Sequence, residues 1–461
     1  MKNIMLSILK SWATKTGNVS STDEILRWIK DLNNTIKVNI KKDSLENSTF
    51  WYYDWDNGSI VNKNNSFFSI QGMQWINNNQ ILAEHPIIVQ DEIGYLGIIC
   101  KEIDGVTNFL MQAKIEPGNI NKIQISPTIQ ATKSNFMQKH GGKKPAYLDY
   151  FLNATNYDII VDQIQSEQSS RFYKKRNRNI IIKVNNDVEL LPNFKWMTLG
   201  QIKELMKYEN LVNMDTRTVI SCIPFSLYTY EKDEIDELDK IFSDSSLLKS
   251  MLFGENKISY IYHSINNYKM FDDSIVKLVS LNQLKNWQMV NNEYICNDEY
   301  HFKVIFCDIA IEGREVQQWT QPLFEAYGIA TFGLITYEDN GTKKFIIKLK
   351  SEIGCFDKAE LGPTIQNEST EKQIINNCID ELFWNNVNSK TNIVFDNLLS
   401  EEGGRFYCEQ NRNIIVNVNK ESIKDLPKNY LSVDYKTLNY LIQANNVVNI
   451  QLRNLISLLE A

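Results

Sequence analysis

The sequence lacks the long apolar runs, paired cysteines and clustered histidines that mark several common classes of protein. No uninterrupted apolar stretch approaches the roughly 20 residues that a membrane-spanning helix needs, and residues 1–10 are apolar too briefly for the core of a secretory signal. The seven cysteines are scattered without a Cys-x-x-Cys pair, and the four histidines lie far apart. We therefore expect a soluble, cytoplasmic protein with reduced thiols and no bound metal.

Motifs for nucleotide cofactors are missing as well. No Gly-x-Gly-x-x-Gly segment follows a predicted strand and no Gly-x-x-x-x-Gly-Lys-Ser/Thr segment occurs, so we expect neither a dinucleotide cofactor nor a P-loop. The formal net charge of −7 argues against a dominant attraction to nucleic acid or to anionic lipid. With 461 residues, the chain is long enough for two or three hydrophobic cores, and two domains are the natural starting expectation.

What the sequence does contain is an internal repeat. Residues 109–118, Phe-Leu-Met-Gln-Ala-Lys-Ile-Glu-Pro-Gly, return at 345–354 as Phe-Ile-Ile-Lys-Leu-Lys-Ser-Glu-Ile-Gly. In both copies the proline of Pro-Thr-Ile-Gln follows nine residues after the glycine, at 127–130 and 363–366. The shared order and spacing indicate a duplicated lobe.

The repeat continues toward the end of each copy. Ser-Glu-Gln-Ser-Ser-Arg-Phe-Tyr at 166–173 matches Ser-Glu-Glu-Gly-Gly-Arg-Phe-Tyr at 400–407, and each is followed by Asn-Arg-Asn-Ile. Each copy then closes with a helical pattern that carries Val-Asn and a following arginine, Arg217 or Arg453. We predict two lobes, residues 20–225 and 240–461. The charged segment between them, residues 231–240, suits the start of a solvated helix.

Hydrophobic alternation predicts strands inside each copy. Apolar residues from Phe109 to Ile115 occupy alternate positions, as do those of 123–129, while residues 22–36, 199–209 and 435–443 have helical patterns. Strand clusters flanked by helices favour an α+β lobe over a doubly wound parallel sheet.

The polar face of these strands supplies the first candidate ligand contacts. Both copies keep a lysine and a glutamate two residues apart, and then a threonine and a glutamine two residues apart, although a merely solvated face is free to change. The candidates on this face are Gln112, Lys114, Glu116, Gln124, Ser126, Thr128 and Gln130 in the first copy, and Lys350, Glu352, Glu360, Thr364 and Gln366 in the second. A sheet with one solvated face remains the alternative.

The arginine segments supply the second group. Arg171 and Arg405 recur, with Asn177-Arg178 and Asn411-Arg412 after them, whereas the basic residues at 174–176 become Cys-Glu-Gln at 408–410. The repeat therefore keeps these particular arginines and not positive charge in general. A planar guanidinium can bind a diphosphate through two hydrogen bonds, so we expect Arg171 and Arg405 each to do so in its own lobe. An arginine tied to a neighbouring carboxylate is the alternative at each position.

Two further features, the Glu-Glu-Gly-Gly segment and His140, are possible sites of chemistry. Glu-Glu-Gly-Gly at 401–404 matches the end of the Nudix hydrolase box, but Asn397-Leu398 stand where that box needs Arg-Glu, and Ser389 where it needs a further glutamate. Pyrophosphate hydrolysis is therefore disfavoured. His140 lies in a Gly-rich loop, where a solvent-exposed histidine is a better interpretation than a general base.

Long motifs in both copies closely resemble the NDP-hexose 2,3-dehydratases of deoxysugar pathways. They include Gln-Ala-Lys-Ile-Glu-Pro-Gly-Asn at 112–119, Ser-Pro-Thr-Ile-Gln-Ala-Thr at 126–132, Asn-Met-Asp-Thr-Arg at 213–217, Glu-Leu-Gly-Pro-Thr-Ile-Gln at 360–366 and Ser-Glu-Glu-Gly-Gly-Arg-Phe at 400–406. The resemblance implies two Nudix-like lobes without hydrolase activity, a homodimer, and a nucleotide-sugar pocket in each lobe. It also implies dTDP-4-keto-6-deoxy-D-glucose as substrate and a ketoreductase that acts next.

The implied elimination is consistent with the residues present. A 4-keto group acidifies the C3 proton, so a base can remove it while an acid assists departure of the C2 hydroxyl, and no hydride moves. Lys114 or Lys350 is a candidate donor to the enolate oxygen. We expect acid–base catalysis in the second lobe, because Glu360 and Glu402 stand there in place of Gln124 and Gln168, and an amide cannot exchange a proton near neutral pH.

The remaining candidates are assigned to binding. Glu116 and Glu352 occur in both copies and are better explained by binding or by pairing with Lys114 and Lys350. Together with the polar face and the arginine segments, Glu401 completes the predicted substrate contacts. A non-catalytic nucleotide-sugar sensor or scaffold and a degenerate hydrolase remain alternatives.

Overall fold

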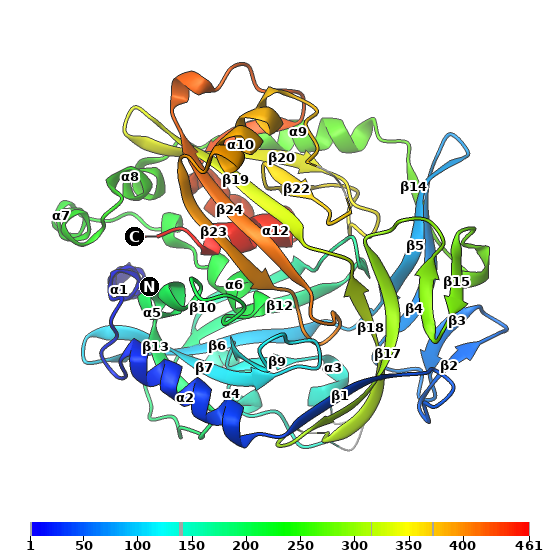
Figure 1. The fold of residues 1–461 in the computed structure, drawn as a ribbon. Coiled ribbons are helices and arrows are strands. Elements are labelled where there is room, and N and C mark those ends of the chain that lie inside the picture. Colours follow the sequence, from blue (N-terminus) through cyan, green and yellow to red (C-terminus); the bar gives the residue numbers. More distant parts are fainter. Residues whose placement is uncertain (1, 138–141, 315, 371–372, 461) are drawn as a thin grey trace.

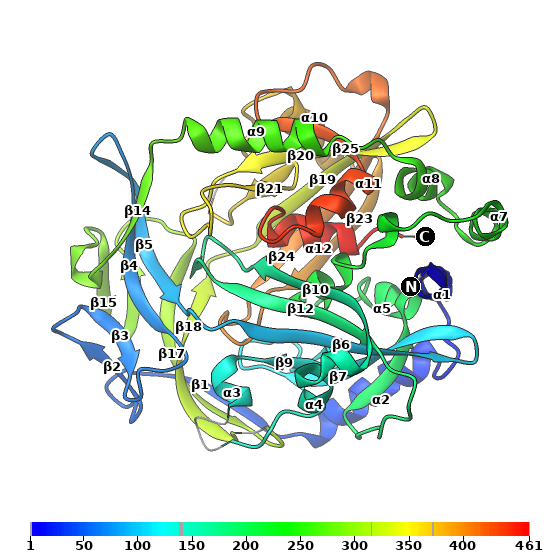
Figure 2. The ribbon, with the colours of Figure 1, turned by 180° about the vertical axis from the view of Figure 1, so that it is seen from behind.

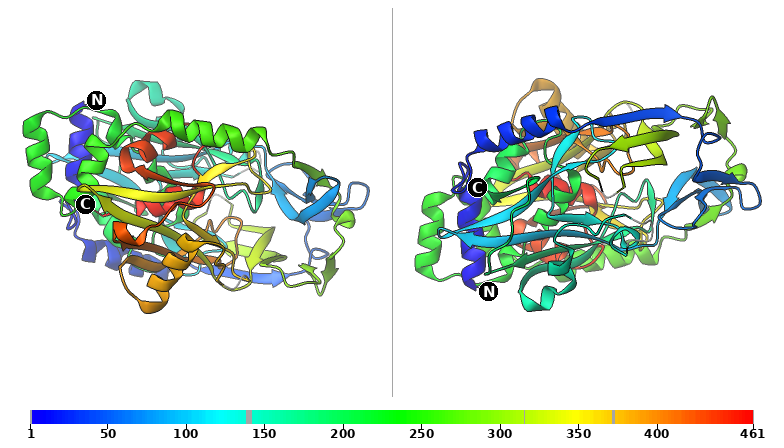
Figure 3. Two further views of the ribbon diagram at one scale, coloured as in Figure 1. Left: turned by 90° about the horizontal axis from the view of Figure 1, so that it is seen from above. Right: turned by 90° about the horizontal axis from the view of Figure 1, so that it is seen from below.

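Two large mixed sheets form the centre of the molecule, and two smaller sheets form one end of it. The computed structural model describes residues 2–137, 142–314, 316–370 and 373–460. We refer to residues 20–225 as the N-terminal half and to residues 240–461 as the C-terminal half. Seen from above and below, the molecule is elongated, and the small sheets lie opposite the end that carries the chain termini (Figures 1 and 3).

The large sheet of the N-terminal half has seven strands. In spatial order they are β10 (Asp158–Ser166), β12 (Arg176–Lys183), β6 (Gly94–Ile103), β7 (Val106–Ile115) and β13 (Phe194–Thr198), with β8 (Ile123–Ser126) paired to β7 and β9 (Ile129–Ala131) paired to β6. β12 and β6 run parallel, and the other pairs are antiparallel.

The large sheet of the C-terminal half repeats this topology. Its order is β23 (Ile393–Ser400), β24 (Gln410–Val418), β19 (Ala330–Asp339), β20 (Thr342–Lys350) and β25 (Tyr430–Asp434), with β21 (Glu360–Gly362) paired to β20 and β22 (Ile365–Asn367) paired to β19. The parallel pair, β24 and β19, occupies the same place as β12 and β6. The predicted α+β class and the predicted repeat are confirmed.

The small sheets exchange strands between the halves. One consists of β11 (Phe172–Tyr173), β5 (Gln80–Val89), β4 (Ser69–Asn77), β3 (Ser59–Asn62) and β2 (Trp51–Asp54), with β14 (Ile275–Val279) paired to β4. The other consists of β1 (Val38–Asp43), β17 (Phe302–Ile311), β16 (Glu293–Cys296) and β15 (Trp287–Val290), with β18 (Gln318–Ala326) paired to β17. β1 therefore joins strands of the C-terminal half, and β14 joins strands of the N-terminal half.

The arginine segments also cross between the halves. The amide of Gly118 donates to the carbonyl of Gly403 at 2.7 Å, and the amide of Gly354 donates to the carbonyl of Ser169 at 2.8 Å. A Cβ on Gly118 would lie 1.6 Å from the carbonyl oxygen of Phe406, so only glycine permits this approach. Both copies of the repeat thus need glycine at this position because the backbone there closely contacts the other half of the chain.

Helices pack on both faces of the large sheets. α4 (Leu148–Leu152) and α10 (Cys378–Ser389) lie on the outer faces. α6 (Met214–Ser221) and α12 (Ile450–Ser457) pack against each other between the sheets (Figure 1), and Figure 2 shows α12 from behind. Both begin at an asparagine N-cap, Asn213 or Asn449, whose side chain accepts from a backbone amide of the first turn.

The helices predicted from sequence are present. They are α2 (Thr22–Thr35), α5 (Leu199–Leu205) and α11 (Tyr435–Ile442), and the predicted solvated helix is α7 (Lys232–Ile241). The remaining helices are α1 (Lys2–Ala13), α3 (Lys133–Phe136), α8 (Ser245–Phe253) and α9 (Ile258–Met270). In the described part of the chain, no helix combines the length and the apolar character that a membrane span requires.

Candidate active site

A cavity of about 620 Å³ opens between the large sheet of the N-terminal half, the small sheets and the loop after β23. The N-terminal half contributes Gln90, Lys114, Glu116, Gln130, Glu167, Lys175, Asn177 and Asp215, and the C-terminal half contributes Arg314, Trp319, Gln321, Glu402 and Arg405. Phe50, Phe67 and Phe68 add aromatic surface to the same cavity. Residues of both halves therefore build one site.

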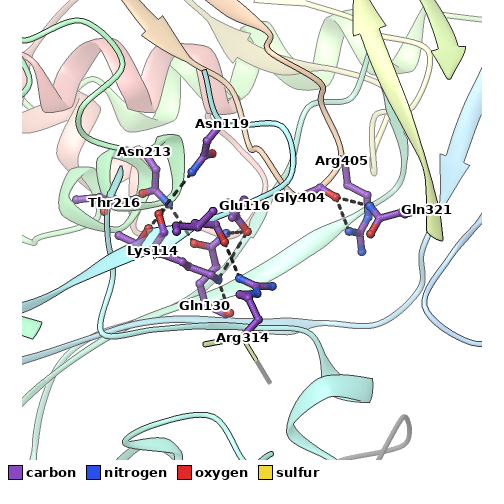
Figure 4. A network of polar contacts seen from close by, with 12 residues as sticks. Lys114, Glu116, Asn119, Gln130, Asn213, Thr216, Arg314, Gln321, Gly404 and Arg405 are labelled. Atoms are coloured by element: carbon purple, nitrogen blue, oxygen red, sulfur yellow. Dashed lines mark hydrogen bonds and ion pairs between the residues drawn. The ribbon is translucent and has the colours of Figure 1, made fainter. Parts of the chain in front are cut away.

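A hydrogen-bonded chain fixes the polar floor of this cavity (Figure 4). The Nζ of Lys114 donates to the carbonyl of Gln130 at 2.9 Å and lies 3.6 Å from Oε1 of Glu116. The side-chain amide of Gln130 donates to the same Glu116 oxygen at 3.0 Å, and Asn213 donates to Gln130 Oε1 at 3.0 Å. Because Asn213 is also the N-cap of α6, the start of this helix sets the orientation of Glu116.

Carboxyl groups with raised pKa values gather around this floor. Burial, and then the neighbouring Glu116 carboxylate, raise the pKa of Glu402 to about 7. Burial raises the pKa of Asp215 well above its ordinary value, and the carboxylates of Glu167 and Glu402 add to this shift. The site therefore holds two buried carboxyl groups with raised pKa values, which suits them to general acid–base roles.

The cations that line the cavity include Lys114, Lys175 and Arg405. Lys175 donates to the carbonyl of Glu92, and burial lowers the pKa of its ammonium group to about 8 against the opposing effect of Glu167. The guanidinium of Arg405 lies 4.4 Å from the centre of the Phe68 ring and donates to Gln90 Oε1 at 3.4 Å. Within the described residues, Arg405 forms no ion pair with a carboxylate, so its charge is available to an anion.

Several buried polar atoms of the cavity have no partner among the residues that the structure describes. They are Nε2 of Gln90, Nε of Arg405 and Oδ1 of Asp215. Buried polar atoms left unpaired among the lining residues favour a ligand that carries complementary groups. In the same described ranges, no group of three or more His, Cys, Asp or Glu side chains has an arrangement that could hold a metal ion.

The equivalent location in the C-terminal half has different chemistry. The repeat places Gln451 and Gln168 opposite Asp215 and Glu402, and Glu409 opposite Lys175. Arg171, the counterpart of Arg405, lies 3.7 Å from Glu409 and 3.9 Å from Glu368. Two carboxyl groups are thus replaced by amides, and the arginine is engaged by carboxylates of the protein itself.

Each arginine lies at the site of the opposite half, which differs from the expected placement in its own lobe. Arg171 packs against Phe302 of the C-terminal half, with 4.3 Å between the guanidinium and the ring centre, and Arg405 lies in the cavity of the N-terminal half. The physical reason is the crossing of the two arginine segments at Gly118 and Gly354.

The predicted catalytic pair of the C-terminal half is not brought together. Glu402 lines the cavity, whereas Glu360 does not, because its strand β21 belongs to the other large sheet. Oε2 of Glu360 accepts from Ser166 at 3.0 Å, and burial raises the pKa of Glu360 to about 7. Lys350 and Glu352 also remain in the C-terminal half, 3.9 Å apart.

Two of the predicted substrate contacts instead form hydrogen bonds within the protein. The hydroxyl of Thr128 donates to Leu110 and accepts from Ile99, and Thr364 does the same with Ile346 and Ile335. Both threonines therefore join neighbouring strands and have no free hydroxyl for a sugar.

The arginine pair that follows the crossing segments is also engaged. Arg178 and Arg412 form two-pronged pairs with Asp162 and Asp396, each with a shortest contact of 2.6 Å. The alternative foreseen for any single arginine, a tie to a neighbouring carboxylate, therefore holds for these two.

The remaining candidates divide between the two sites. Asn177 donates to Glu167 in the cavity at 2.7 Å, and Asn411 donates to Glu401, its counterpart. Gln366 donates to Glu352 at 2.7 Å, as Gln130 does to Glu116. Ser126 accepts from Asn213 at 2.9 Å.

Gln112 and Gln124 do not line the cavity, and both side-chain polar atoms of Gln124 are buried without a partner among the described residues. His140 lies outside the described residues.

Sequence reasoning missed Gln90, Glu167, Lys175 and Asp215 as members of the site. Asp215 had a usable signal, because the repeat exchanges it for Gln451 in the same carboxyl-to-amide manner as Glu402 and Gln168. Lys175 had one too, since its counterpart Glu409 reverses the charge. Gln90 precedes the repeated motifs, and only the folded chain brings it to the cavity.

Comparison with known proteins identifies the family. A family model described as NDP-hexose 2,3-dehydratase matches residues 22–223 and 259–459. A dTDP-4-dehydro-6-deoxy-alpha-D-glucopyranose 2,3-dehydratase of Saccharopolyspora spinosa is 34% identical over 460 residues, covering 95% of this chain and 91% of that protein. A protein of the same name from Amycolatopsis orientalis is 31% identical over 463 residues, covering 98% of this chain and 93% of that protein. The chain belongs to the NDP-hexose 2,3-dehydratase family.

Proposed function

We propose that this chain eliminates water across C2 and C3 of dTDP-4-keto-6-deoxy-D-glucose, and that the cavity of the N-terminal half is its active site. The observation that carries the proposal is the contrast between the two halves. Glu402, Asp215 and Arg405 meet in this cavity, whereas the C-terminal counterpart has two amides and an arginine paired with Glu409. The cavity of the N-terminal half thus brings two carboxyl groups with raised pKa values together with an arginine available to a diphosphate.

The reaction requires two proton transfers and no electron acceptor. A base removes the C3 proton, and the electron pair of that bond forms the C3–C4 enolate with its charge on O4. The C4 carbonyl then re-forms, a C2–C3 double bond forms, and the C2–oxygen bond breaks while an acid protonates the departing hydroxyl to water. The enol product becomes the 3,4-diketo-2,6-dideoxy sugar nucleotide when its O3 hydroxyl loses its proton, C3 becomes a carbonyl, and the electron pair of the C2–C3 double bond takes up a proton at C2.

We assign Glu402 as the base and Asp215 as the acid. A carboxyl group with a pKa near 7 is ionised often enough to accept a proton and basic enough to hold it. Burial, and then the neighbouring carboxylates of Glu167 and Glu402, raise the pKa of Asp215 well above its ordinary value, which favours the protonated form that an acid needs. Lys114 is assigned to the enolate oxygen, because its ammonium group has three donors and uses one on Gln130. This assignment retains Glu402 from the sequence prediction and replaces Glu360.

The nucleotide is assigned to the part of the cavity that Arg405 shares with the aromatic residues. Nε of Arg405 and Nε2 of Gln90 are unpaired buried donors, and a diphosphate offers acceptors to both. Phe50, Phe67 and Trp319 line the same cavity and offer aromatic rings on which a nucleobase can stack. The sugar then points toward Glu402 and Asp215.

The decisive experiment supplies dTDP-4-keto-6-deoxyglucose together with a ketoreductase and detects the 2-deoxy product. Formation of that product supports the proposal. Binding of the substrate without turnover would instead identify a nucleotide-sugar sensor, the alternative from the sequence. Release of dTMP and a sugar phosphate would identify a hydrolase.

The proposal extends to the lobes, the oligomeric state, the location of the protein and the next enzyme. We infer that each half is a Nudix-like lobe, with residues 20–225 and 240–461 as the two units. We further infer that the protein forms a homodimer and works in the cytoplasm. The diketone product is reactive, so a ketoreductase is the expected next enzyme. Size-exclusion chromatography with light scattering tests the dimer directly.

A further inference from the structure

Two buried arginines tie the halves together where the central helices cross. Arg217 lies on α6 and Arg453 lies on α12, and both side chains are buried. Nη2 of Arg217 donates to the carbonyl of Ser400 at 2.5 Å, and Nη2 of Arg453 donates to the carbonyl of Ser166. Ser400 and Ser166 are the last residues of β23 and β10, so each arginine holds the end of a strand in the other half.

The residues directly after Ser400 carry the proposed base. Glu401 accepts from Asn411 of its own half and from Gln168 of the N-terminal half, whereas Glu402 lines the cavity. Further along, Gly403 accepts from the Gly118 amide at 2.7 Å. The segment that presents Glu402 is therefore held before and after that residue by groups of the N-terminal half.

We propose that Arg217 is a positioning residue for the elimination, which holds the end of β23 so that Glu402 reaches the reacting carbon from the opposite half of the chain. The inference rests on the proposed function of Glu402. It is supported by the recurrence of the contact, because Arg453 holds the strand end that precedes Glu167, and Glu167 lines the same cavity. Two copies that have diverged elsewhere keep one arrangement at the two strand ends that feed the site.

Arg217 supplies charge as well as geometry. Its guanidinium interacts with the carboxyl groups of Glu401 and Asp215, which lie on opposite sides of the boundary between the halves. A lysine at this position keeps the charge but is a single point donor on a flexible stem, whereas a glutamine removes the charge. Comparing the two substitutions therefore distinguishes the effect of the guanidinium's hydrogen-bond geometry on turnover from the effect of its charge.

The test compares Arg217→Lys and Arg217→Gln with Lys203→Met. Lys203 is a suitable control because it too is a buried cation that crosses the halves, donating to the carbonyls of Ser457 and Leu459 at 2.6 and 2.9 Å, and it does not line the cavity. Turnover, KM and Tm are measured for each variant, and amide deuterium uptake of residues 400–406 is measured without substrate.

We expect both Arg217 variants to lower kcat by about 10–100-fold with KM within about threefold, since misplacing a catalytic group by ~1 Å costs on this order. Faster deuterium uptake at residues 400–406 accompanies the loss. Lys203→Met lowers Tm and leaves kcat and the uptake of this segment as in the unmodified protein. If Arg217→Gln is recovered only unfolded, Arg217→Lys decides the question alone.

Two results would overturn the inference. One is an Arg217→Lys protein with unchanged kcat and unchanged uptake at residues 400–406. The other is a loss of kcat that Lys203→Met reproduces at equal Tm, because the effect would then be general destabilisation. An unmodified protein without dehydratase activity would refute the proposed function instead, and the deuterium uptake would still report whether Arg217 holds the segment.

Discussion

Glu402 and Glu116, which come from opposite halves of the chain, approach each other beside Gly404. A Cβ on Gly404 would lie 2.2 Å from Oε1 of Glu402 and 3.3 Å from Oε1 of Glu116. The absence of a side chain at this position lets the two carboxyl groups share one region of the cavity. Their mutual repulsion adds to the effect of burial on the pKa of Glu402 and prepares that group to accept a proton.

Replacement of Asp215 separates the two proton transfers. In Asp215→Asn, we expect elimination to fall by about 10²–10⁴-fold, because an amide cannot protonate the leaving hydroxyl. Exchange of the C3 proton with deuterated solvent should continue, since Glu402 remains. NMR of the substrate in D₂O measures both rates at once. Loss of exchange together with elimination would show that Asp215 is the base. The matched control is Gln451→Asn in the other half.

The two arginines of the repeat should respond differently to the same change. Arg405→Lys keeps the charge but loses the two-pronged donor, so the affinity for dTDP should fall by about 1–3 kcal/mol. Arg171→Lys should leave that affinity unchanged, because Arg171 is already engaged by Glu409 and Glu368. Calorimetric titration with dTDP compares the two variants. Equal losses would mean that both arginines contact the same ligand or that the half-to-half contrast is not functional.

Glu360 gives a prediction about stability at different pH values. Its pKa is raised from 4.5 in the unfolded chain to about 7 in the folded protein. The folded state therefore holds this proton more tightly, so the stabilising contribution is complete below pH 4.5 and is lost as the pH rises through 7. Glutamine resembles the protonated acid. Glu360→Gln should match the unmodified protein at about pH 4 and exceed it by about 1–3 kcal/mol at pH 8.

Urea unfolding at the two pH values measures this difference. The exposed Glu299 provides the control, because Glu299→Gln should change stability equally little at both. A Glu360→Gln protein that is less stable than the unmodified protein at pH 8 would show that ionised Glu360 makes a favourable contact.

Catalysis should need no added cofactor. The elimination moves two protons and no hydride, so we expect full turnover without nicotinamide and after treatment with EDTA. Product formation is compared before and after chelation, with the ketoreductase step run separately afterwards because that enzyme has its own cofactor. Activity that disappears with EDTA and returns with one divalent ion would require a metal in the reaction.

The sequence predicts the repeated sheets well but not how the halves interlock. The motifs at 109–130 and 345–366 alternate clearly, and they form equivalent strands and connections in both large sheets. β1 and β14 precede these motifs, and each pairs with a strand about two hundred residues away in sequence or more. No local pattern encodes a partner at that distance, because period and propensity describe only the strand itself.

This interlocking explains why the candidate site was only partly predictable. The comparison of Glu402 with Gln168 selected a carboxyl group that lines the cavity. It did not reveal that this group lines a cavity of the N-terminal half, because a comparison of the two copies does not show that the segment after β23 crosses to Gly118. Glu360 satisfied the same comparison with Gln124 and yet lies in the other large sheet. A position that carries a carboxyl group in one copy and an amide in the other is therefore a candidate for the site. The topology of the folded chain decides which of these candidates lie in the same cavity.

The most direct test compares Glu402→Gln with Glu360→Gln on dTDP-4-keto-6-deoxyglucose in D₂O. Both variants replace a buried carboxyl group in the C-terminal half by its amide, and the pKa of each carboxyl group is raised to about 7. With Glu402 as the base, Glu402→Gln should lose C3 exchange and product formation by about 10²–10⁴-fold while it still binds dTDP, and Glu360→Gln should keep both within about threefold. Retained exchange in Glu402→Gln together with its loss in Glu360→Gln would move the chemistry to the C-terminal half and contradict the site proposed here.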